Sequence, residues 1–246
     1  MATEPVVKIE RNPVTFDILT IFPAMFDNIF SESIVGRAVQ EKNMTINVYD
    51  LRKWASDKHK TVDDEPYGGG AGMVLKPEPI FKAVNELKTK YARKHEKAIQ
   101  HSILLTPKGT QYNHRIAEKL SHLDHIILIC GHYEGVDHRV FEFCADEHIS
   151  IGDYILTGGE LPAMILVDSV TRLVPGVVGN SDSIENETFS YTHEGLLKYP
   201  VYTRPEEYEG HKVPEILLSG NHQEVDKWRK EEAQKLTKKF RPDLLK

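Results

Sequence analysis

Short, continuous apolar runs alternate with amphipathic segments along the first two thirds of the chain. A run in which nearly every residue is apolar is typical of a strand buried on both faces, as in parallel sheets. The intervening segments carry apolar residues at helical spacing. This alternation predicts an α/β fold with a mostly parallel sheet covered by helices. The predicted strands are residues 14–23, 45–51, 102–106, 125–130 and 148–151, and the predicted helices are residues 24–43, 111–121 and 136–144, with a further helix after Pro77 and Pro79.

The last third of the chain has a different pattern. Apolar residues recur at helical spacing from Leu161 until Pro175-Gly176 ends that helix. The next stretch, through residue 194, is polar and rich in turn formers, which predicts a mobile linker or lid. Beyond it, a short second unit ends in a helix over residues 224–240 with an apolar stripe among lysines and arginines. This basic face is either an ordinary solvated face or one that contacts RNA.

The composition is that of a globular protein. Hydrophobic residues make up 40% of the chain and charged residues 28%. The N-terminal segment lacks the apolar core of a signal peptide, and no later run approaches the ~20 apolar residues of a membrane span. We therefore expect a cytoplasmic protein without membrane association. The formal net charge of −6 predicts that any RNA binding depends on local basic patches.

Cysteines and histidines give little indication of a disulfide or a metal ion. Cys130 and Cys144 lie in apolar surroundings, which favours reduced, buried thiols over a disulfide or a reactive pair. His122 and His125 have a possible ligand spacing, but no cysteine or carboxylate cluster completes a site near them. We expect no bound metal.

Glycine-rich loops are the clearest indication of a ligand site. The stretch PYGGGAGMVL, residues 66–75, lacks both the GxGxxG spacing and the GK[ST] ending of known phosphate-binding loops. It predicts a flexible loop whose backbone can approach another group closely. Three further glycine-bearing loops, TPKGT, CGHYEGVD and GDYILTGGE, each follow a predicted strand. Because ligands of open parallel sheets bind beyond the carboxyl ends of strands, these loops predict one shared pocket, although glycines also serve strand-end turns without any ligand.

Four motifs, in order, carry a resemblance to a known family: DKHKTVDDEPYGGGAGM, CGHYEGVD, SIGDYILTGGELPAM and GLLKYPVYTRP. They resemble the bacterial tRNA (guanine-N1)-methyltransferases, which modify the guanine just 3′ of the anticodon, and the resemblance extends from Thr15 to the C-terminus. It implies a SPOUT-type α/β domain with a deep trefoil knot, which ordinary rules of chain topology would exclude. It also implies S-adenosylmethionine as methyl donor, tRNA as substrate and a homodimer. The implied domains are an N-terminal extension (1–13), the methyltransferase domain (14–174), the linker or lid (175–194) and a helical C-terminal tRNA-binding domain (195–246).

The resemblance further implies which residues bind the donor. The knot loops would hold the adenosine between backbone groups and apolar walls, and Glu134 would lie near the methionine end. The acidic residues of SIGDYILTGGELPAM are expected to be structural rather than catalytic. The implied donor residues are Thr106, Pro107, Gly109, Gly131, Tyr133, Glu134, Ile151, Gly152, Asp153, Tyr154, Ile155, Leu156, Gly158, Gly159 and Pro162.

Methylation of guanine N1 restricts which side chains can catalyse it. N1 carries a proton, so a base must remove that proton while N1 attacks the methyl group, and negative charge develops on O6. The family's base is an aspartate followed by serine or threonine and then phenylalanine; the matching triplet here begins with Glu187, and Asp182 or Glu185 are less favoured substitutes. Arg172 matches the family's arginine and suits stabilisation of O6. Without that match, we would interpret Arg172 as a helix-end arginine near the helix dipole.

Two other positions depart from the family pattern. His132 stands where arginine is usual, and Lys198 stands where relatives often carry an acid. Neither change affects the backbone-lined pocket, so we expect activity to persist. Two alternatives stay open: an RNA-binding SPOUT protein that has lost catalysis, suggested by His132 and Glu187, and a dinucleotide-dependent oxidoreductase, which the missing GxGxxG pattern disfavours.

Basic residues in two segments are the predicted tRNA contacts. Lys58, His59 and Lys60 would contact phosphates of the anticodon loop, and Arg204 of the YTRP segment would contact the stem.

Overall fold

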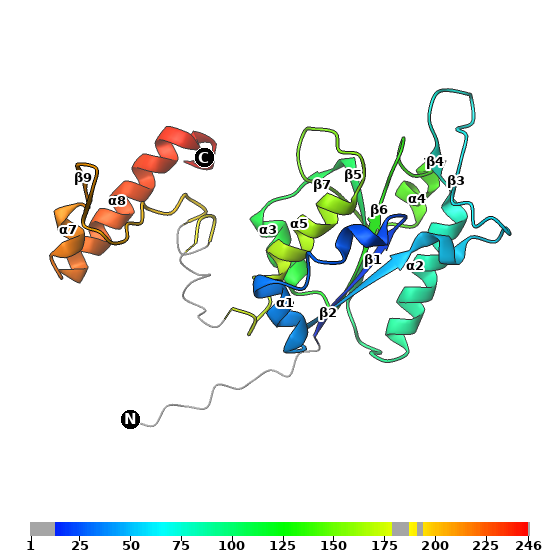
Figure 1. Ribbon diagram of the computed structural model, residues 1–246, viewed down its shortest axis with the longest axis horizontal. Coiled ribbons are helices and arrows are strands. Elements are labelled where there is room, and N and C mark those ends of the chain that lie inside the picture. Colours follow the sequence, from blue (N-terminus) through cyan, green and yellow to red (C-terminus); the bar gives the residue numbers. More distant parts are fainter. Residues whose placement is uncertain (1–12, 179–186, 191–193, 246) are drawn as a thin grey trace. The chain divides into compact units, whose positions relative to one another are not determined.

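The computed structural model describes residues 13–178, 187–190 and 194–245. The chain divides into two compact units, Met1–Val178 and Gly179–Lys246. In Figure 1 the first contains the sheet with helices on both of its faces, and the second is dominated by one long helix, α8.

The first unit contains a five-stranded sheet with the strand order β2-β1-β6-β5-β7. Every neighbouring pair in this sheet is parallel. The predicted mostly parallel sheet is therefore confirmed. A two-stranded antiparallel pair, β3 and β4, flanks the glycine-rich loop at residues 66–72. The strands are β1 (Val14–Thr20), β2 (Met44–Asp50), β3 (Asp63–Asp64), β4 (Val74–Leu75), β5 (Gln100–Gln111), β6 (His125–Cys130) and β7 (Glu147–Ser150).

Helices cover both faces of the sheet, which explains the continuous apolar runs. Along β6, Ile126 and Leu128 pack with α1, α3 and α5 on one face, whereas Ile127 and Ile129 pack with α2 and α4 on the other. A strand between two helical layers buries side chains in both directions, so polar alternation is lost. The helices are α1 (Ser33–Gln40), α2 (Pro77–Ala92), α3 (His114–Ser121), α4 (His138–Phe143) and α5 (Glu160–Thr171), with 3-10 turns η1 (Pro23–Phe26) and η2 (Leu51–Trp54).

The predicted single helix over residues 24–43 is wrong. The segment contains η1 and the shorter helix α1, separated by residues 27–32. Both the backbone N and the side-chain Oγ of Ser31 donate to the carbonyl of Asn28, and Ser33 has a φ of 56°. A serine side chain that bonds nearby backbone competes with helical hydrogen bonds, and the positive φ of Ser33, the first residue of α1, prevents the helical conformation from extending upstream of that residue.

Strand β5 is longer than predicted and is interrupted. Its pairing with β7 shifts register, so that Leu105 and Thr110 both lie opposite Ile149. Residues 106–109 therefore leave the ladder and form a loop at the carboxyl end of the sheet.

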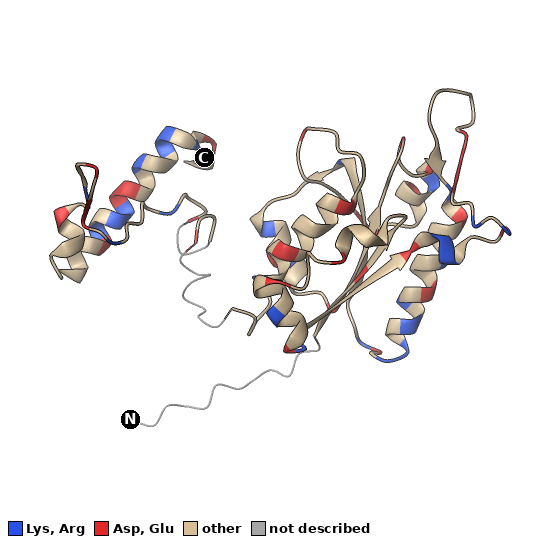
Figure 2. Cartoon of the chain, viewed as in Figure 1, with Lys and Arg blue, Asp and Glu red and all other residues tan. Residues whose placement is uncertain are grey.

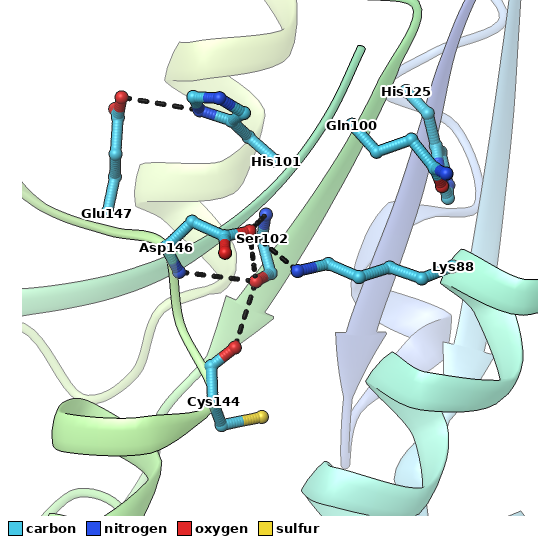
Figure 3. A network of polar contacts seen from close by, with 8 residues as sticks. All are labelled: Lys88, Gln100, His101, Ser102, His125, Cys144, Asp146 and Glu147. Atoms are coloured by element: carbon cyan, nitrogen blue, oxygen red, sulfur yellow. Dashed lines mark hydrogen bonds and ion pairs between the residues drawn. The ribbon is translucent and has the colours of Figure 1, made fainter. Parts of the chain in front are cut away.

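A polar network joins α2, β5 and the residue before β7 (Figure 3). Oδ2 of Asp146 accepts hydrogen bonds from Lys88 Nζ at 2.7 Å, from Ser102 N at 2.7 Å and from Ser102 Oγ at 2.8 Å. Beside it, His101 Nδ1 lies 3.3 Å from Glu147 Oε1. These contacts tie the edge strand β7 to β5 and so help to place the loops that follow both strands.

The second unit is built around α8 (His222–Phe240), which confirms the helix predicted over residues 224–240. Val225, Ala233 and Thr237 form its buried side, and lysines and arginines recur along it in Figure 2. Within the described ranges, no helix combines the length and the apolar character needed to cross a membrane. The other elements are β8 (Glu207–Tyr208), β9 (His211–Lys212), α7 (Glu215–Leu218) and η4 (Pro242–Leu245).

Candidate functional site

A cavity of about 510 Å³ lies at the carboxyl ends of β5, β6 and β7. These strands are neighbours in the sheet, so the loops that follow them meet. Helix α4 contributes His138 and Phe141 to the lining, and the start of α5 contributes Pro162. The position is the one at which parallel sheets bind ligands, and the volume falls within the roughly 300–1,000 Å³ typical of small-molecule sites.

The structure brings all but two of the predicted donor residues to this cavity. Gly109 instead packs against the backbone of β7, where a Cβ atom would overlap the amide of Ile149. Asp153 is exposed and does not line the cavity. The predicted residues in the lining are Thr106, Pro107, Gly131, Tyr133, Glu134, Ile151, Gly152, Tyr154, Ile155, Leu156, Gly158, Gly159 and Pro162.

Gly158 and Gly159 let two backbone segments pass close together at the cavity wall. The amide of Gly159 donates to the carbonyl of Gly131 at 2.8 Å, and Gly158 forms an isolated antiparallel bridge with His132. A Cβ on Gly159 would lie 2.7 Å from Cys130 Cα. The absence of side chains thus allows the start of α5 to lie directly against the end of β6.

The glycine-rich loop at residues 66–72 is anchored beside the cavity. Glu134 N donates to Met73 O at 3.1 Å, and Leu75 N donates to Gly135 O at 3.0 Å. A Cβ on Gly72 would lie 2.8 Å from Glu134 Cγ. The sequence predicted that the backbone of this loop approaches another group closely, and that group is the cavity residue Glu134.

A buried carboxylate, that of Glu160, lies next to the cavity residue His132. Glu160 is only 1% exposed, and its Oε1 accepts a 2.7 Å hydrogen bond from Thr20 Oγ1. Its Oε2 lies 3.8 Å from Nδ1 of His132, which lines the cavity. Burial, with the nearby charge of Glu160, raises the pKa of the Cys130 thiol well above its usual range. These contacts agree with a structural role for Glu160 and join the end of β1 to the cavity.

Sequence reasoning missed much of the apolar lining. Leu105 and Ile149 come from the strands themselves, and Val136 and Phe141 come from the loop after β6 and from α4. All four are apolar, and they lie within predicted elements: Leu105 and Ile149 in predicted strands, and Val136 and Phe141 in the helix predicted over residues 136–144. The same description applies to ordinary core residues, so the sequence offered no way to separate the two.

Arg172 does not line the cavity. It is the C-cap of α5, whereas Pro162 lies in the first turn of that helix. Ten residues of α-helix separate their backbones by about 15 Å. Within one chain, the cavity and the predicted O6 contact therefore lie at opposite ends of α5.

Glu187 belongs to the second compact unit. It begins a turn in which its carbonyl accepts a hydrogen bond from Ser190 N at 3.2 Å. Asp182 and Glu185 lie outside the described residues. Lys198, one of the departures from the family pattern, places its Nζ 5.6 Å from the ring centre of Tyr199.

The predicted tRNA contacts are exposed. Lys58, His59 and Lys60 lie in the loop after η2, where the carboxylate of Asp57 accepts hydrogen bonds from backbone N of His59 at 3.0 Å and of Thr61 at 2.8 Å. Arg204 is exposed in the second unit.

Metal and disulfide chemistry find no support among the residues that the structure describes. No group of three or more histidine, cysteine, aspartate or glutamate residues there could hold a metal ion. Cys130 is free and buried, and Cys144 is free and partly buried.

Comparison with known proteins decides the family. The model of the family described as tRNA (Guanine-1)-methyltransferase TrmD matches residues 14–246. The chain belongs to this family. Curated relatives named tRNA (guanine-N(1)-)-methyltransferase include a Dictyoglomus turgidum protein, 56% identical over 93% of this chain and 89% of its own length. Another, from Geobacter sp. (strain M21), is 52% identical over 94% of this chain and 89% of its own length. A third, from Clostridioides difficile, is 48% identical over 94% of this chain and 97% of its own length.

Membership of the tRNA (guanine-1)-methyltransferase family confirms the resemblance inferred from the four motifs. A methyltransferase requires a site for a methyl donor. The cavity at the carboxyl edge of the sheet is the candidate for that site, because most of its lining comes from the motifs that carry the resemblance.

Proposed function

We propose that this methyltransferase transfers a methyl group from S-adenosylmethionine to N1 of guanine 37 of tRNA, the guanine 3′ of the anticodon. Family membership supports methylation of guanine N1 in tRNA. The observation that carries the choice of donor is the cavity at the carboxyl ends of β5, β6 and β7. Position 37 rests on the motifs that resemble enzymes acting beside the anticodon.

The residues present fit an adenosine-containing donor. Residues 151, 152 and 154–156 line one side of the cavity, where their backbone groups can donate and accept hydrogen bonds, and Leu105 and Phe141 supply apolar surface. Glu134 adds a carboxylate suited to a cationic ligand. S-adenosylmethionine, when bound, supplies an electrophilic methyl group on a positively charged sulfur.

Glu187 and Arg172 are the proposed catalytic residues. Glu187 removes the N1 proton of guanine, so that the N1 lone pair is free to attack the methyl carbon. Arg172 donates hydrogen bonds to O6 and stabilises the negative charge that develops there. The linker at residues 175–194 acts as a lid that brings Glu187 to the guanine when tRNA binds.

The surface of α5 supports a homodimer. This helix buries one side in the core, yet Leu161 and Ile165 on its other side are 48% and 43% exposed. Met25 and Ile29, from the neighbouring η1 segment, are 46% and 50% exposed. A second copy would cover these side chains through a two-fold interface. Because Arg172 and the cavity lie at opposite ends of α5, we propose an active site assembled from both copies.

The path of the chain after β7 supports the proposed trefoil knot. It leaves the edge strand β7, forms the cavity loop and returns to the end of β6, where Gly159 N bonds to Gly131 O. The loop at residues 106–109 of the intervening strand β5 lies against the backbone of β7. If the segment after β7 passes through the loop at residues 106–109, the chain forms a knot. Since tRNA is the substrate, we place the enzyme in the cytoplasm.

The proposed tRNA contacts lie in both units. Lys58, His59 and Lys60 contact the anticodon loop, and Arg204 contacts the stem. Their exposure and the lysines and arginines of α8 (Figure 2) support electrostatic contact with phosphates.

Methylation of a defined transcript tests the proposal. The purified protein should transfer labelled methyl from S-adenosylmethionine to a tRNA with guanine at position 37 and not to one with adenine there. Glu187→Gln should lower the rate by about 10²–10⁴-fold with donor affinity intact, whereas Glu187→Asp, which keeps the carboxylate, should retain more activity. Binding of tRNA without methyl transfer would favour the RNA-binding alternative, and calorimetry showing NAD binding in place of S-adenosylmethionine binding would favour the oxidoreductase.

A further inference from the structure

The residues around Glu187 form a folded turn. Phe189 N donates to Leu196 O at 3.0 Å, and Gly195 N donates to Ser190 O at 3.0 Å. Phe189 has a φ of 70°, a conformation that L-residues adopt only when surrounding contacts hold it. Residues 187–190 and 194–198 are therefore held together by specific hydrogen bonds.

Two threonine hydroxyls hold this turn. Thr188 Oγ1 accepts a hydrogen bond from Lys198 N at 3.1 Å. Thr237 Oγ1, on α8, accepts one from Leu197 N at 3.0 Å and donates to Ala233 O at 2.7 Å. Thr237 is fully buried. Its hydroxyl thus uses its single proton within α8 and offers a lone pair to the turn, which valine, of nearly the same shape, cannot do.

Packing around the turn adds to these bonds. Ser190 is only 6% exposed, and the guanidinium carbon of Arg241, just beyond α8, lies 5.8 Å from the ring centre of Phe189. The turn that carries Glu187 is consequently attached to the long helix of the second unit.

We propose that Thr237 is a positioning residue for methyl transfer, acting through Glu187. Its hydroxyl docks the turn on α8, so the C-terminal unit presents the carboxylate. This inference rests on the proposed function, in which Glu187 takes the N1 proton. A base must come within about 2.6–3.2 Å of that proton's nitrogen, and a displacement of about 1 Å can cost 10²-fold in rate. A side chain that contacts neither substrate can therefore control the rate.

Single-turnover methylation by the full-length enzyme, with saturating S-adenosylmethionine and tRNA transcript, tests the proposal. Thr237→Val should lower the rate at least tenfold, while the dissociation constants for donor and tRNA change by less than threefold. Thr237→Ser, which keeps the hydroxyl, should stay within threefold of the parent. Ser219→Ala is the matched control, because it removes a hydroxyl bonded to Ile216 O elsewhere in the same unit, and it should leave the rate unchanged.

A double-mutant cycle separates positioning from general stability. If Thr237 acts through Glu187, Thr237→Val should add less than a twofold loss in a Glu187→Gln background. An equal loss in both backgrounds, a parental rate for Thr237→Val, or a loss confined to tRNA affinity would overturn the inference. If Thr237→Val does not fold, Thr188→Val removes the other acceptor without altering α8 and is judged by the same criteria. A parent enzyme that does not methylate the transcript contradicts the proposed function itself, whereas an active parent insensitive to these changes contradicts only this inference.

Discussion

Gly159 shows how little space the backbone leaves at the cavity wall. Its φ of −83° is accessible to any residue, so the requirement for glycine is steric. A Cβ would lie 2.7 Å from Cys130 Cα and 3.0 Å from Gly131 N, and neither backbone atom can rotate away. A larger residue must separate α5 from the end of β6, which shifts the cavity wall.

We predict that Gly159→Ala destabilises the protein by about 1–3 kcal/mol and weakens S-adenosylmethionine binding at least tenfold. Urea unfolding and isothermal titration calorimetry measure the two effects. Gly131→Ala is the stability control, since its added Cβ meets nothing closer than Val136 Cγ1 at 3.6 Å, and it should change the unfolding free energy by less than about 1 kcal/mol. Parental stability and affinity in Gly159→Ala would show that the wall can move freely.

The two cysteines should be unreactive at neutral pH. Burial raises the pKa of the Cys144 thiol to about 11, and burial with the charge of Glu160 raises the pKa of the Cys130 thiol well above its usual range. Because the thiolate is the reactive form, iodoacetamide should label the native protein at pH 7.5 far more slowly than the urea-unfolded protein. Labelling of Cys144 should accelerate about tenfold per pH unit until the pH approaches 11. Mass spectrometry measures the labelling of each cysteine over time. Equal labelling rates for the native and the unfolded protein would contradict the prediction that the thiols are unreactive.

At the scale of elements, the network around Asp146 fastens the edge strand β7 (Figure 3). Partial burial acts to raise the pKa of this carboxyl, but the hydrogen bonds from Lys88 and Ser102 outweigh burial and lower the pKa below its ordinary value. A carboxylate with a lowered folded pKa stabilises the protein above its unfolded pKa of about 3.9. That contribution is lost as the pH falls through the folded value.

Asp146→Asn should therefore lower the free energy of unfolding at pH 7 by about 1–2 kcal/mol, a modest value because the side chain is 42% exposed. The difference from the parent protein should shrink below about pH 4. Urea unfolding at pH 7 and pH 3 measures both. Lys82→Ala breaks the exposed ion pair with Glu78 and should cost no more than about 0.5 kcal/mol. A pH-independent difference for Asp146→Asn would assign the loss to packing.

At the scale of the whole molecule, the exposed apolar side of α5 should be the dimer interface. Ile165→Asp places a charge in that surface and should convert the proposed dimer to a monomer and abolish methylation, because the proposed active site needs both copies. Analytical ultracentrifugation gives the oligomeric state. Ile99→Asp is the control, since Ile99 is 55% exposed away from α5, just before β5. A dimeric, active Ile165→Asp protein would place the interface elsewhere.

The sequence by itself determined most elements of the first unit and the glycine-bearing loops of the cavity. A strand buried on both faces leaves a nearly unbroken apolar run, so β1, β5 and β6 were predictable from their own residues. The strands β2 and β7 were predicted from shorter, more polar runs. The glycine-bearing loops at strand ends could likewise be recognised from their own residues. The helix predicted over residues 24–43 failed because a serine hydroxyl and a positive φ, rather than hydrophobic periodicity, decided that segment.

Only the tertiary structure decided which residues meet. The order β6-β5-β7 brings three loops to one cavity, and it places Gly109 against the backbone of β7 and leaves Asp153 in solvent. Thr20 and Glu160 bond across 140 residues, and Leu197 reaches Thr237 across 40. Such contacts leave no periodic trace, because each depends on how distant elements pack and not on the local run of side chains.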